Sequence, residues 1–154
     1  MPQVASLRQS GHYRTPCFPA GAGPDYVNAA VRLETGLGPE ALLEALHGIE
    51  AEFGRRRVTR WGARTLDLDL LDHSEQVRPD LGAYAAWRDL PPARQAQEAP
   101  ERLILPHPRI QDRAFVLIPL ADVAPDWHHP VSGRSVAELI AALPAAEREA
   151  IRRL

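Results

Sequence analysis

The chain has 154 residues, 45% of them hydrophobic and 25% charged, which is typical of one soluble globular domain. All 18 basic residues are arginines. This excludes the phosphate-binding lysine of P-loop proteins, the strand lysine of protein kinases and a lysine Schiff base. The net charge of −2 argues against a general nucleic-acid binder, because there is no excess of positive charge to release counterions.

The cellular location is predicted from three features of the sequence. The single cysteine, Cys17, has no internal disulfide partner, which favours a reducing compartment. No apolar run approaches the ~18 residues of a membrane span, and the first ten residues lack the apolar core of a signal peptide. We therefore expect a cytoplasmic protein.

Strand patterns dominate the first third of the chain. Residues 4–13 resemble a weak strand, and the proline- and glycine-rich residues 14–24 predict a loop. Residues 26–34 alternate with period two and predict one strand. Its buried face would carry the set Val27, Ala29, Val31 and Leu33.

The middle of the chain predicts a helix followed by a strand. Residues 39–53 repeat apolar side chains with the 3.6-residue period, Pro39 suits the first helical position and Gly54 suits the C-terminal stop. Residues 64–71 alternate again, so Leu66, Leu68 and Leu70 are expected inside, with Asp67 and Asp69 on the opposite face.

The last third predicts helices. Residues 78–100 are rich in proline and alanine and predict an insertion or long loop with a short helix near 83–89. Residues 115–123 favour a helix over a buried strand, and Ser135 with Glu138 forms a capping-box pattern before a final helix. Strand and helix patterns in mixed order predict an α+β fold.

The pair Asp67 and Asp69 carries the clearest chemical pattern. On a strand both carboxylates point the same way, roughly 6–7 Å apart, and hard oxygen ligands of this kind suit Mg²⁺. A solvated polar strand face is the alternative. The spacing alone supports both interpretations about equally.

An arginine cluster precedes this pair, formed by Arg55, Arg56, Arg57, Arg60 and Arg64. The planar guanidinium fork matches phosphate oxygens, so carboxylates and arginines together suit a metal–polyphosphate complex. A charged loop that offsets the dipole of the preceding helix is the alternative, and phosphate binding is favoured over it.

Four other side chains are candidates with ordinary alternatives. Trp61 is a packing anchor or a surface on which a planar ring stacks. Asn28 can pair with the edge of a heterocycle, but from the residues alone an exposed strand face is favoured for both Asn28 and Tyr26. His107 is a candidate because Pro106 and Pro108 hold it in a stiff loop, and the alternative is an ordinary surface histidine.

The run Arg60-Trp61-Gly62-Ala63-Arg64-Thr65-Leu66-Asp67-Leu68-Asp69 closely resembles the signature of the 6-hydroxymethyl-7,8-dihydropterin pyrophosphokinase family. Residues 13–16, 25–29, 49–55, 106–109 and 113–115 resemble further segments of that family, in the same order. The resemblance extends from about residue 12 to about residue 125, with an insertion near 78–100.

The resemblance implies a ferredoxin-like sandwich, a mainly antiparallel sheet covered by helices, as one domain over 1–154. In that family a strand with Gly-Ser-Asn and a helix come first, and this sequence begins after them. We therefore expect that this chain lacks part of the family's core. We also expect that adding such a strand and helix before residue 1 would raise both its stability and its turnover.

The resemblance also implies residue roles. Asp67 and Asp69 resemble the ligands of two Mg²⁺ ions, and Arg55 and Arg64 resemble arginines that bind the triphosphate and stabilise the transferred group. The implied nucleotide site comprises Leu43, His47, Arg57, Trp61, Arg64, Arg102, His107 and Arg113. The implied pterin site comprises Thr15, Pro16, Phe18, Tyr26, Asn28, Trp61 and Phe115.

The implied reaction is the transfer of pyrophosphate from ATP to the hydroxymethyl group of the dihydropterin, in folate biosynthesis, with AMP as the other product. The implied partners are small molecules, with no nucleic acid or membrane, and we expect a monomer. A remnant that binds nucleotide or pterin without catalysis is the alternative, and a hydrolase of phosphate esters is a third hypothesis. Pro108 stands where the family commonly has an aromatic residue, and the insertion adjoins residues 102–113, so assignments there are less secure than those in 55–69.

Overall fold

The computed structural model describes residues 3–16, 24–55, 66–95 and 97–154. Antiparallel sheets combine with helices in it, which confirms the predicted α+β class. In the described part of the chain, no helix is long and apolar enough to cross a membrane. The predictions for Cys17, Phe18, Arg57, Trp61 and Arg64 fall outside the described residues, as does the side chain of Arg55.

In the described residues, five strands form two small antiparallel sheets. One pairs β1 (Val4–Gln9) with β4 (Val31–Thr35). The other has the order β3-β2-β5, with β2 at Tyr13–Thr15, β3 at Tyr26–Asn28 and β5 at Arg152–Arg153. The prediction of a loop from residue 14 onward was therefore wrong for Arg14 and Thr15, which pair with β3 and, at Arg14, also with β5.

The predicted single strand over 26–34 is two strands. Ser10 and Ala30 join the sheets where the chain bends: the Ser10 amide donates to the Ala30 carbonyl at 2.9 Å, and the Ala30 amide donates to Ser10 Oγ at 2.8 Å. The bend breaks the period-two alternation, so Ala30 is buried instead of Ala29. The predicted buried face was wrong for Val27, Ala29 and Val31, which are exposed, while Leu33 is half-buried.

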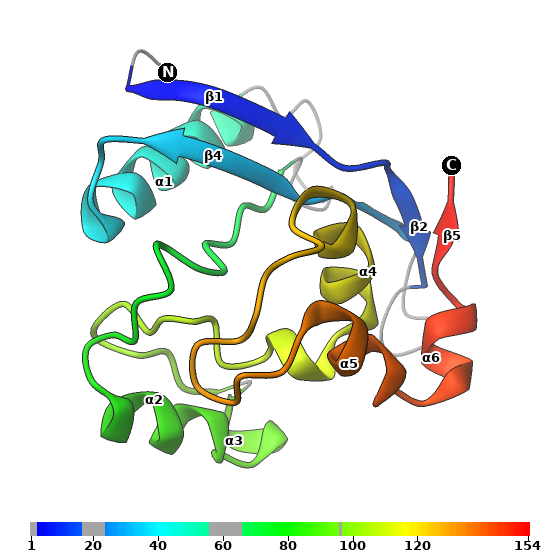
Figure 1. The fold of residues 1–154 in the computed structure, drawn as a ribbon. Helices are drawn as coiled ribbons and strands as arrows, with labels where there is room; N and C mark the ends of the chain where they lie inside the picture. The colour runs from blue at the N-terminus through cyan, green and yellow to red at the C-terminus, as the bar shows by residue number, and fades with distance from the viewer. Residues whose placement is uncertain (1–2, 17–23, 56–65, 96) are drawn as a thin grey trace.

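Helix α1 (Pro39–Arg55) confirms the predicted helix and its start at Pro39, but it continues through Gly54 instead of ending there. It runs beside β4, whereas α2 (Leu81–Arg88) and α3 (Pro92–Gln95) lie at the opposite end of the molecule from β1 (Figure 1). Helix α2 confirms the predicted short helix, and α3 was not predicted. Among the α1 residues whose burial is described, Pro39 and Leu42 are buried.

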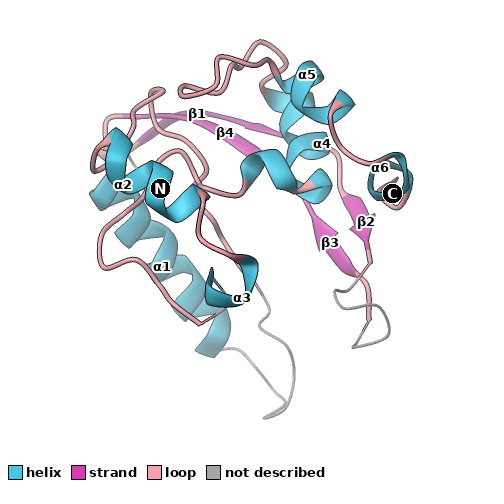
Figure 2. Cartoon of the chain, turned by 90° about the horizontal axis from the view of Figure 1, so that it is seen from below, coloured by secondary structure: helices cyan, strands magenta, loops and turns pink. Residues whose placement is uncertain are grey.

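The core is centred on α4 (Ala114–Val123), which confirms the predicted helix. It contacts β1, β2, β3 and β4, the 3₁₀ turn η1 (Ile110–Asp112), α5 (Val136–Ala141) and α6 (Ala145–Glu149). Viewed from below, α4 lies between α1 and α2 on one side and β2 and β3 on the other (Figure 2). The buried cluster around it comprises Ala30, Ile110, Ala114, Leu117, Val123, Ala124, Trp127, Val136, Leu139 and Leu143.

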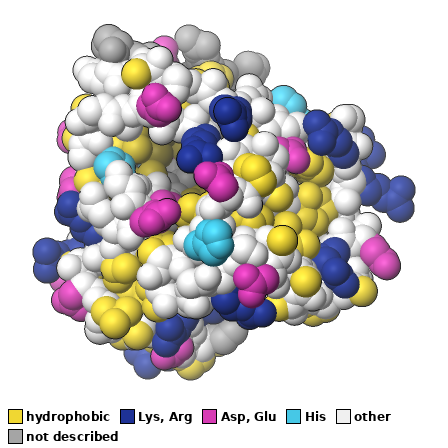
Figure 3. All heavy atoms as spheres, in the orientation of Figure 1, with side chains coloured by type: hydrophobic (Ala, Val, Ile, Leu, Met, Phe, Trp, Pro, Cys, Tyr) yellow, Lys and Arg dark blue, Asp and Glu magenta, His cyan; other side chains and the backbone are white. Residues whose placement is uncertain are grey.

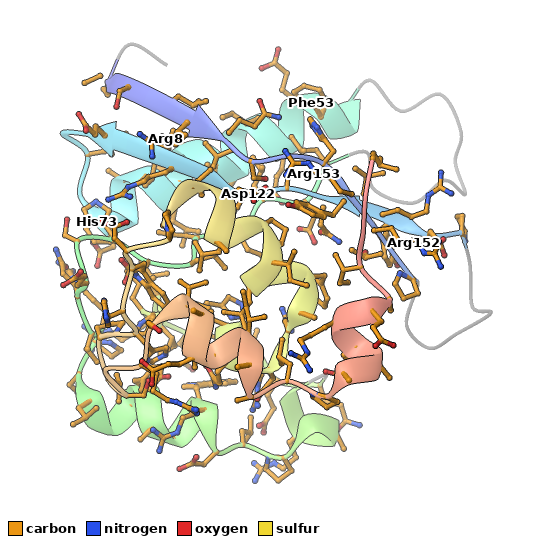
Figure 4. The ribbon with its side chains drawn as sticks, turned by 45° about the vertical axis from the view of Figure 1, so that its right-hand side comes forward. Arg8, Phe53, His73, Asp122, Arg152 and Arg153 are labelled. Carbon is orange, nitrogen blue, oxygen red and sulfur yellow. The ribbon has the colours of Figure 1, made fainter. Side chains whose placement is uncertain are left out.

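The C-terminal part folds back onto β2. Ser135 and Glu138 form the predicted capping box at the start of α5, whereas α6 and β5 were not predicted. Tyr13 Oη donates to Asp122 Oδ2 at 2.6 Å, and Arg153 Nη1 lies 3.7 Å from the same oxygen. Figure 4 shows Arg153 close to Asp122, so α4, β2 and β5 meet at one partly exposed polar contact.

Candidate active site

The Asp67–Asp69 segment is extended but forms no strand in its described part, residues 66–71, so the predicted strand was wrong there. The alternation itself is confirmed, because Leu66, Leu68 and Leu70 are half-buried while Asp67 and Asp69 are exposed. Both carboxylates therefore lie on the solvent side of one extended segment.

Two hydrogen bonds hold this segment in place. The Leu68 amide donates to Glu50 Oε2 of α1 at 2.8 Å, and the Leu71 carbonyl accepts from the His107 amide at 2.8 Å. The segment thus connects α1 on one side with the loop around His107 on the other. The sequence placed Glu50 only at a helix end and missed this contact.

The His107 loop is itself anchored. Leu105 and Arg78 exchange backbone hydrogen bonds of 2.8 and 3.1 Å. His107 Nδ1 accepts from the Arg109 amide at 3.1 Å. Because Nδ1 is an acceptor, the neutral ring carries its proton on Nε2, which is then a donor.

The electrostatics of His107 bring three predicted site residues together. Burial lowers the pKa of the His107 imidazole below its usual value. The charge of Arg113 lowers that pKa further, whereas the charge of Asp69 raises it. Asp69 and Arg113 therefore each lie within electrostatic range of His107, although the three residues come from separate segments of the chain.

Apart from His107 and Arg113, the predicted nucleotide residues that the structure describes lie in two places. Leu43 is half-buried and His47 is exposed, one helical turn apart on α1. Arg102 lines a polar pocket of about 190 Å³ near the start of α1, beside Glu40 and Arg78. Arg78 and Glu40, which both line this pocket, form an ion pair of 2.8 Å that connects α1 with the segment that precedes α2.

The predicted pterin residues gather on β2, β3 and α4. Asn28 Nδ2 donates to Thr15 Oγ1 at 2.8 Å, Tyr26 stands opposite Thr15 in the sheet, and Pro16 follows directly. Phe115 is on α4, which contacts both strands, and the Arg113 guanidinium lies 5.6 Å from the centre of its ring. The side chains of Tyr26 and Phe115 are 52% and 38% exposed.

The donor set at Asp67 and Asp69 fits a magnesium ion that keeps other ligands. In the described ranges no three His, Cys, Asp or Glu side chains are grouped so as to enclose a metal. Mg²⁺ in phosphate-transfer sites is commonly held by one or two carboxylates and completed by water and phosphate oxygens. Two exposed carboxylates on one extended segment suit that arrangement.

These contacts define two groups of site residues. Asp69 and Arg113 lie near His107, where they could bind a metal and phosphates. Thr15, Asn28 and Tyr26 lie on adjacent strands, and Phe115 lies on α4, which contacts both strands. Sequence reasoning missed Glu50 and Arg109, whose structural contacts produce no motif.

Comparison with known proteins identifies several relatives that are named as pyrophosphokinases. The chain is 42% identical over 133 residues to 2-amino-4-hydroxy-6-hydroxymethyldihydropteridine pyrophosphokinase of Synechocystis sp., which covers 86% of this chain and 57% of that protein. It is 47% identical over 121 residues to the protein of that name from Pseudomonas aeruginosa, and this alignment covers 79% of this chain and 62% of that protein. The protein of that name from Methylorubrum extorquens is 39% identical over 142 residues, and the alignment covers 92% of this chain and 76% of that protein.

The chain therefore spans about three fifths of the length of the first two relatives. Residues 2–125 match the profile of the family described as 7,8-dihydro-6-hydroxymethylpterin-pyrophosphokinase (HPPK). This match covers the Asp67–Asp69 segment, the His107 loop and the strands of Thr15 and Asn28. The chain belongs to the HPPK family.

Proposed function

We propose that this chain transfers pyrophosphate from ATP to the hydroxymethyl group of 6-hydroxymethyl-7,8-dihydropterin, giving AMP and the pterin diphosphate. The observation that carries this proposal is the grouping of Asp69, His107 and Arg113, in a chain that belongs to the HPPK family. The finer fold assignment is part of the proposal: the two sheets and their helices would belong to one ferredoxin-like sandwich.

The phosphate side of the site supports the nucleotide half of the proposal. Asp67 and Asp69 would hold the Mg²⁺ ions that accompany ATP, and bound metal neutralises phosphate charge and lowers the pKa of an attacking alcohol. His107 would donate its Nε2–H to a phosphate oxygen, and Arg113 would add a charged fork. Arg55, Arg57, Arg64 and Arg102 are assigned to the same polyphosphate from the resemblance.

The other side of the site supports the pterin half. The Asn28–Thr15 pair sits on two adjacent strands, and its amide and hydroxyl groups would pair with the edge of the heterocycle. Tyr26 and Phe115 would stack on the faces of the pterin ring, beside Pro16, Phe18 and Trp61. Leu43 and His47 would contact the adenosine along α1.

The chain's own residues would act mainly by positioning and charge. Holding the alcohol oxygen in line with the β-phosphorus converts an encounter between two molecules into a reaction within one complex. Arginine forks then offset the charge that develops on bridging and leaving oxygens. In this proposal no side chain has to serve as a strong general base.

The test is to incubate the purified chain with Mg²⁺, ATP and 6-hydroxymethyl-7,8-dihydropterin and to identify the products by chromatography and mass spectrometry. Equal amounts of AMP and pterin diphosphate are expected. Binding of both ligands without AMP would instead support a non-catalytic remnant, and release of inorganic phosphate would indicate a hydrolase. Either of these results would overturn the proposed activity.

A further inference from the structure

Arg109 has an unusual place for a charged side chain next to the His107 loop. Its side chain is only 16% exposed. Nη1 pairs with Asp112 Oδ2 at 2.7 Å, and Nη2 donates to the carbonyls of Arg88 and Leu90 at 2.8 and 3.0 Å. A longer contact of 3.5 Å reaches the carbonyl of Trp87. One guanidinium therefore bridges the η1 turn and the end of α2.

The end of α2 needs such a partner. The last carbonyl oxygens of a helix have no N–H donor within the helix, and they carry the negative end of its dipole. Arg109 donates to the carbonyl of the last helical residue, Arg88, and to that of Leu90 two residues later. The N–H groups of Arg109 supply donors for these carbonyls, and its positive charge offsets the negative end of the dipole.

The backbone of the same residue acts on His107. The Arg109 amide donates to His107 Nδ1 at 3.1 Å, which leaves the proton of the neutral ring on Nε2. Burial and the neighbouring arginines lower the pKa of His107, so the neutral ring is favoured near pH 7. The amide can hold Nδ1 only while residue 109 is fixed, and its side chain fixes it against α2.

We propose that Arg109 is a positioning residue: anchored on the C-terminal end of α2, it holds its amide on His107 Nδ1 and keeps the Nε2–H of His107 as the donor to a nucleotide phosphate. This rests on the proposed function, which places His107 at the phosphates. The end of α2, which lies in the predicted insertion of residues 78–100, thereby becomes a support of the His107 loop.

The binding experiment uses Mg²⁺ with α,β-methylene-ATP, a non-reacting probe, and isothermal titration of the full chain. Arg109→Ala and His107→Ala are each expected to weaken binding about tenfold, the range of one charge-assisted hydrogen bond to phosphate. The double variant is expected to bind no more weakly than His107→Ala, because Arg109 acts through His107. Arg94→Ala is the matched control, because Arg94 is exposed near the end of α2 and pairs only with Glu98 among the contacts described for it; it should bind normally.

The second experiment reads the histidine directly, without nucleotide. Nitrogen-15 NMR separates the Nε2–H from the Nδ1–H form of a neutral histidine, and a His107→Gln difference spectrum assigns the signal. The unaltered chain and Arg94→Ala should show the Nε2–H form, and Arg109→Ala a mixture of both. If Arg109→Ala fails to fold, Asp112→Asn keeps the carbonyl contacts and removes only the ion pair, and a smaller shift towards the mixture is expected.

Two results would overturn the proposal. One is an Arg109→Ala effect on nucleotide affinity that is equally large in the His107→Ala background; the other is an unchanged Nε2–H form in Arg109→Ala. If His107→Ala binds the nucleotide normally, the proposed function fails at His107. The NMR result still decides separately whether Arg109 sets the histidine's form.

Discussion

The two halves of the molecule are built differently. Around α4, side chains such as Leu117, Val123 and Val136 are at most 1% exposed. In the β1–β4 sheet, by contrast, Leu7 and Val31 are 61% and 51% exposed. Hydrophobic side chains also gather near the centre of one face, in the region of α4 and α5 (Figure 3). Stability therefore comes mainly from the α4 half.

The candidate site lies where these halves meet. Glu50 on α1 holds Leu68, while the His107 loop holds Leu71 at the other end of the same segment. Polar contacts, and not a continuous sheet, thus position Asp67 and Asp69. The difference between the halves suggests that activity and stability can be changed separately, and four predictions address this.

The largest effect is expected at the site itself. Asp67→Ala and Asp69→Ala should each reduce AMP formation by about a hundredfold or more, because each removes a ligand of the proposed metal. Both side chains are exposed, so the free energy of unfolding in urea should change by less than about 0.5 kcal/mol. Glu98→Ala, another exposed carboxylate, is the control and should be fully active. Normal turnover by either aspartate variant would contradict the metal assignment.

These two aspartates also show how much the sequence could predict. The alternation of Leu66 to Leu70, the helix starting at Pro39 and the capping box at Ser135 depend on local patterns, and all three are confirmed. The strand over 64–71 is absent in its described part, because a strand requires a partner that local alternation cannot supply.

The errors at 26–34 have a similar cause. Reciprocal contacts between Ser10 and Ala30 bend the chain, and residues 20 apart produce no local pattern. The contacts of Glu50 and Arg109 are equally non-local, which is why the sequence did not mark either residue as part of the site. Thr15 and Asn28, in contrast, were named from the resemblance, and the structure brings them within hydrogen-bond distance.

The second prediction concerns the α4 half. Leu117 is completely buried in the core cluster. Leu117→Ala should lower the free energy of unfolding by about 2–5 kcal/mol, through lost burial and the cavity left behind. Urea unfolding followed by circular dichroism measures it. A loss below about 1 kcal/mol would mean that α4 is not the centre of the core.

The third prediction is a pH dependence in the same half. His129 Nδ1 accepts from the amides of Val131 and Ser132 at 3.1 and 3.2 Å, and its Nε2 lies 3.1 Å from Tyr84 Oη. Burial, helped by the charge of Arg88, lowers the pKa of His129 in the folded chain. The unfolded chain therefore takes up the proton first, so stability is full above about pH 6.5 and falls as the pH drops towards the folded pKa.

His129→Asn tests this, because the asparagine oxygen can replace Nδ1 as acceptor without titrating. The slope of unfolding free energy between pH 7.5 and 5.5 should decrease by up to about 1.4 kcal/mol per pH unit, the value for one proton. His107, whose pKa is also lowered, would leave a residual slope. An unchanged slope would show that His129 takes up its proton equally well in the folded and unfolded chains.

The smallest effect is expected on the β1–β4 sheet. Leu7→Ser and Val31→Thr alter side chains that are 61% and 51% exposed, so little burial is lost. Threonine is β-branched like valine and keeps the strand preference. The free energy of unfolding should change by less than about 0.5 kcal/mol in each variant, in contrast with Leu117→Ala. Sedimentation at matched concentrations is the companion measurement, because an exposed apolar surface can associate. A loss above about 2 kcal/mol, together with a smaller sedimentation coefficient, would show that a second copy covers this sheet in solution, and the contrast between the halves would then apply only to the isolated chain.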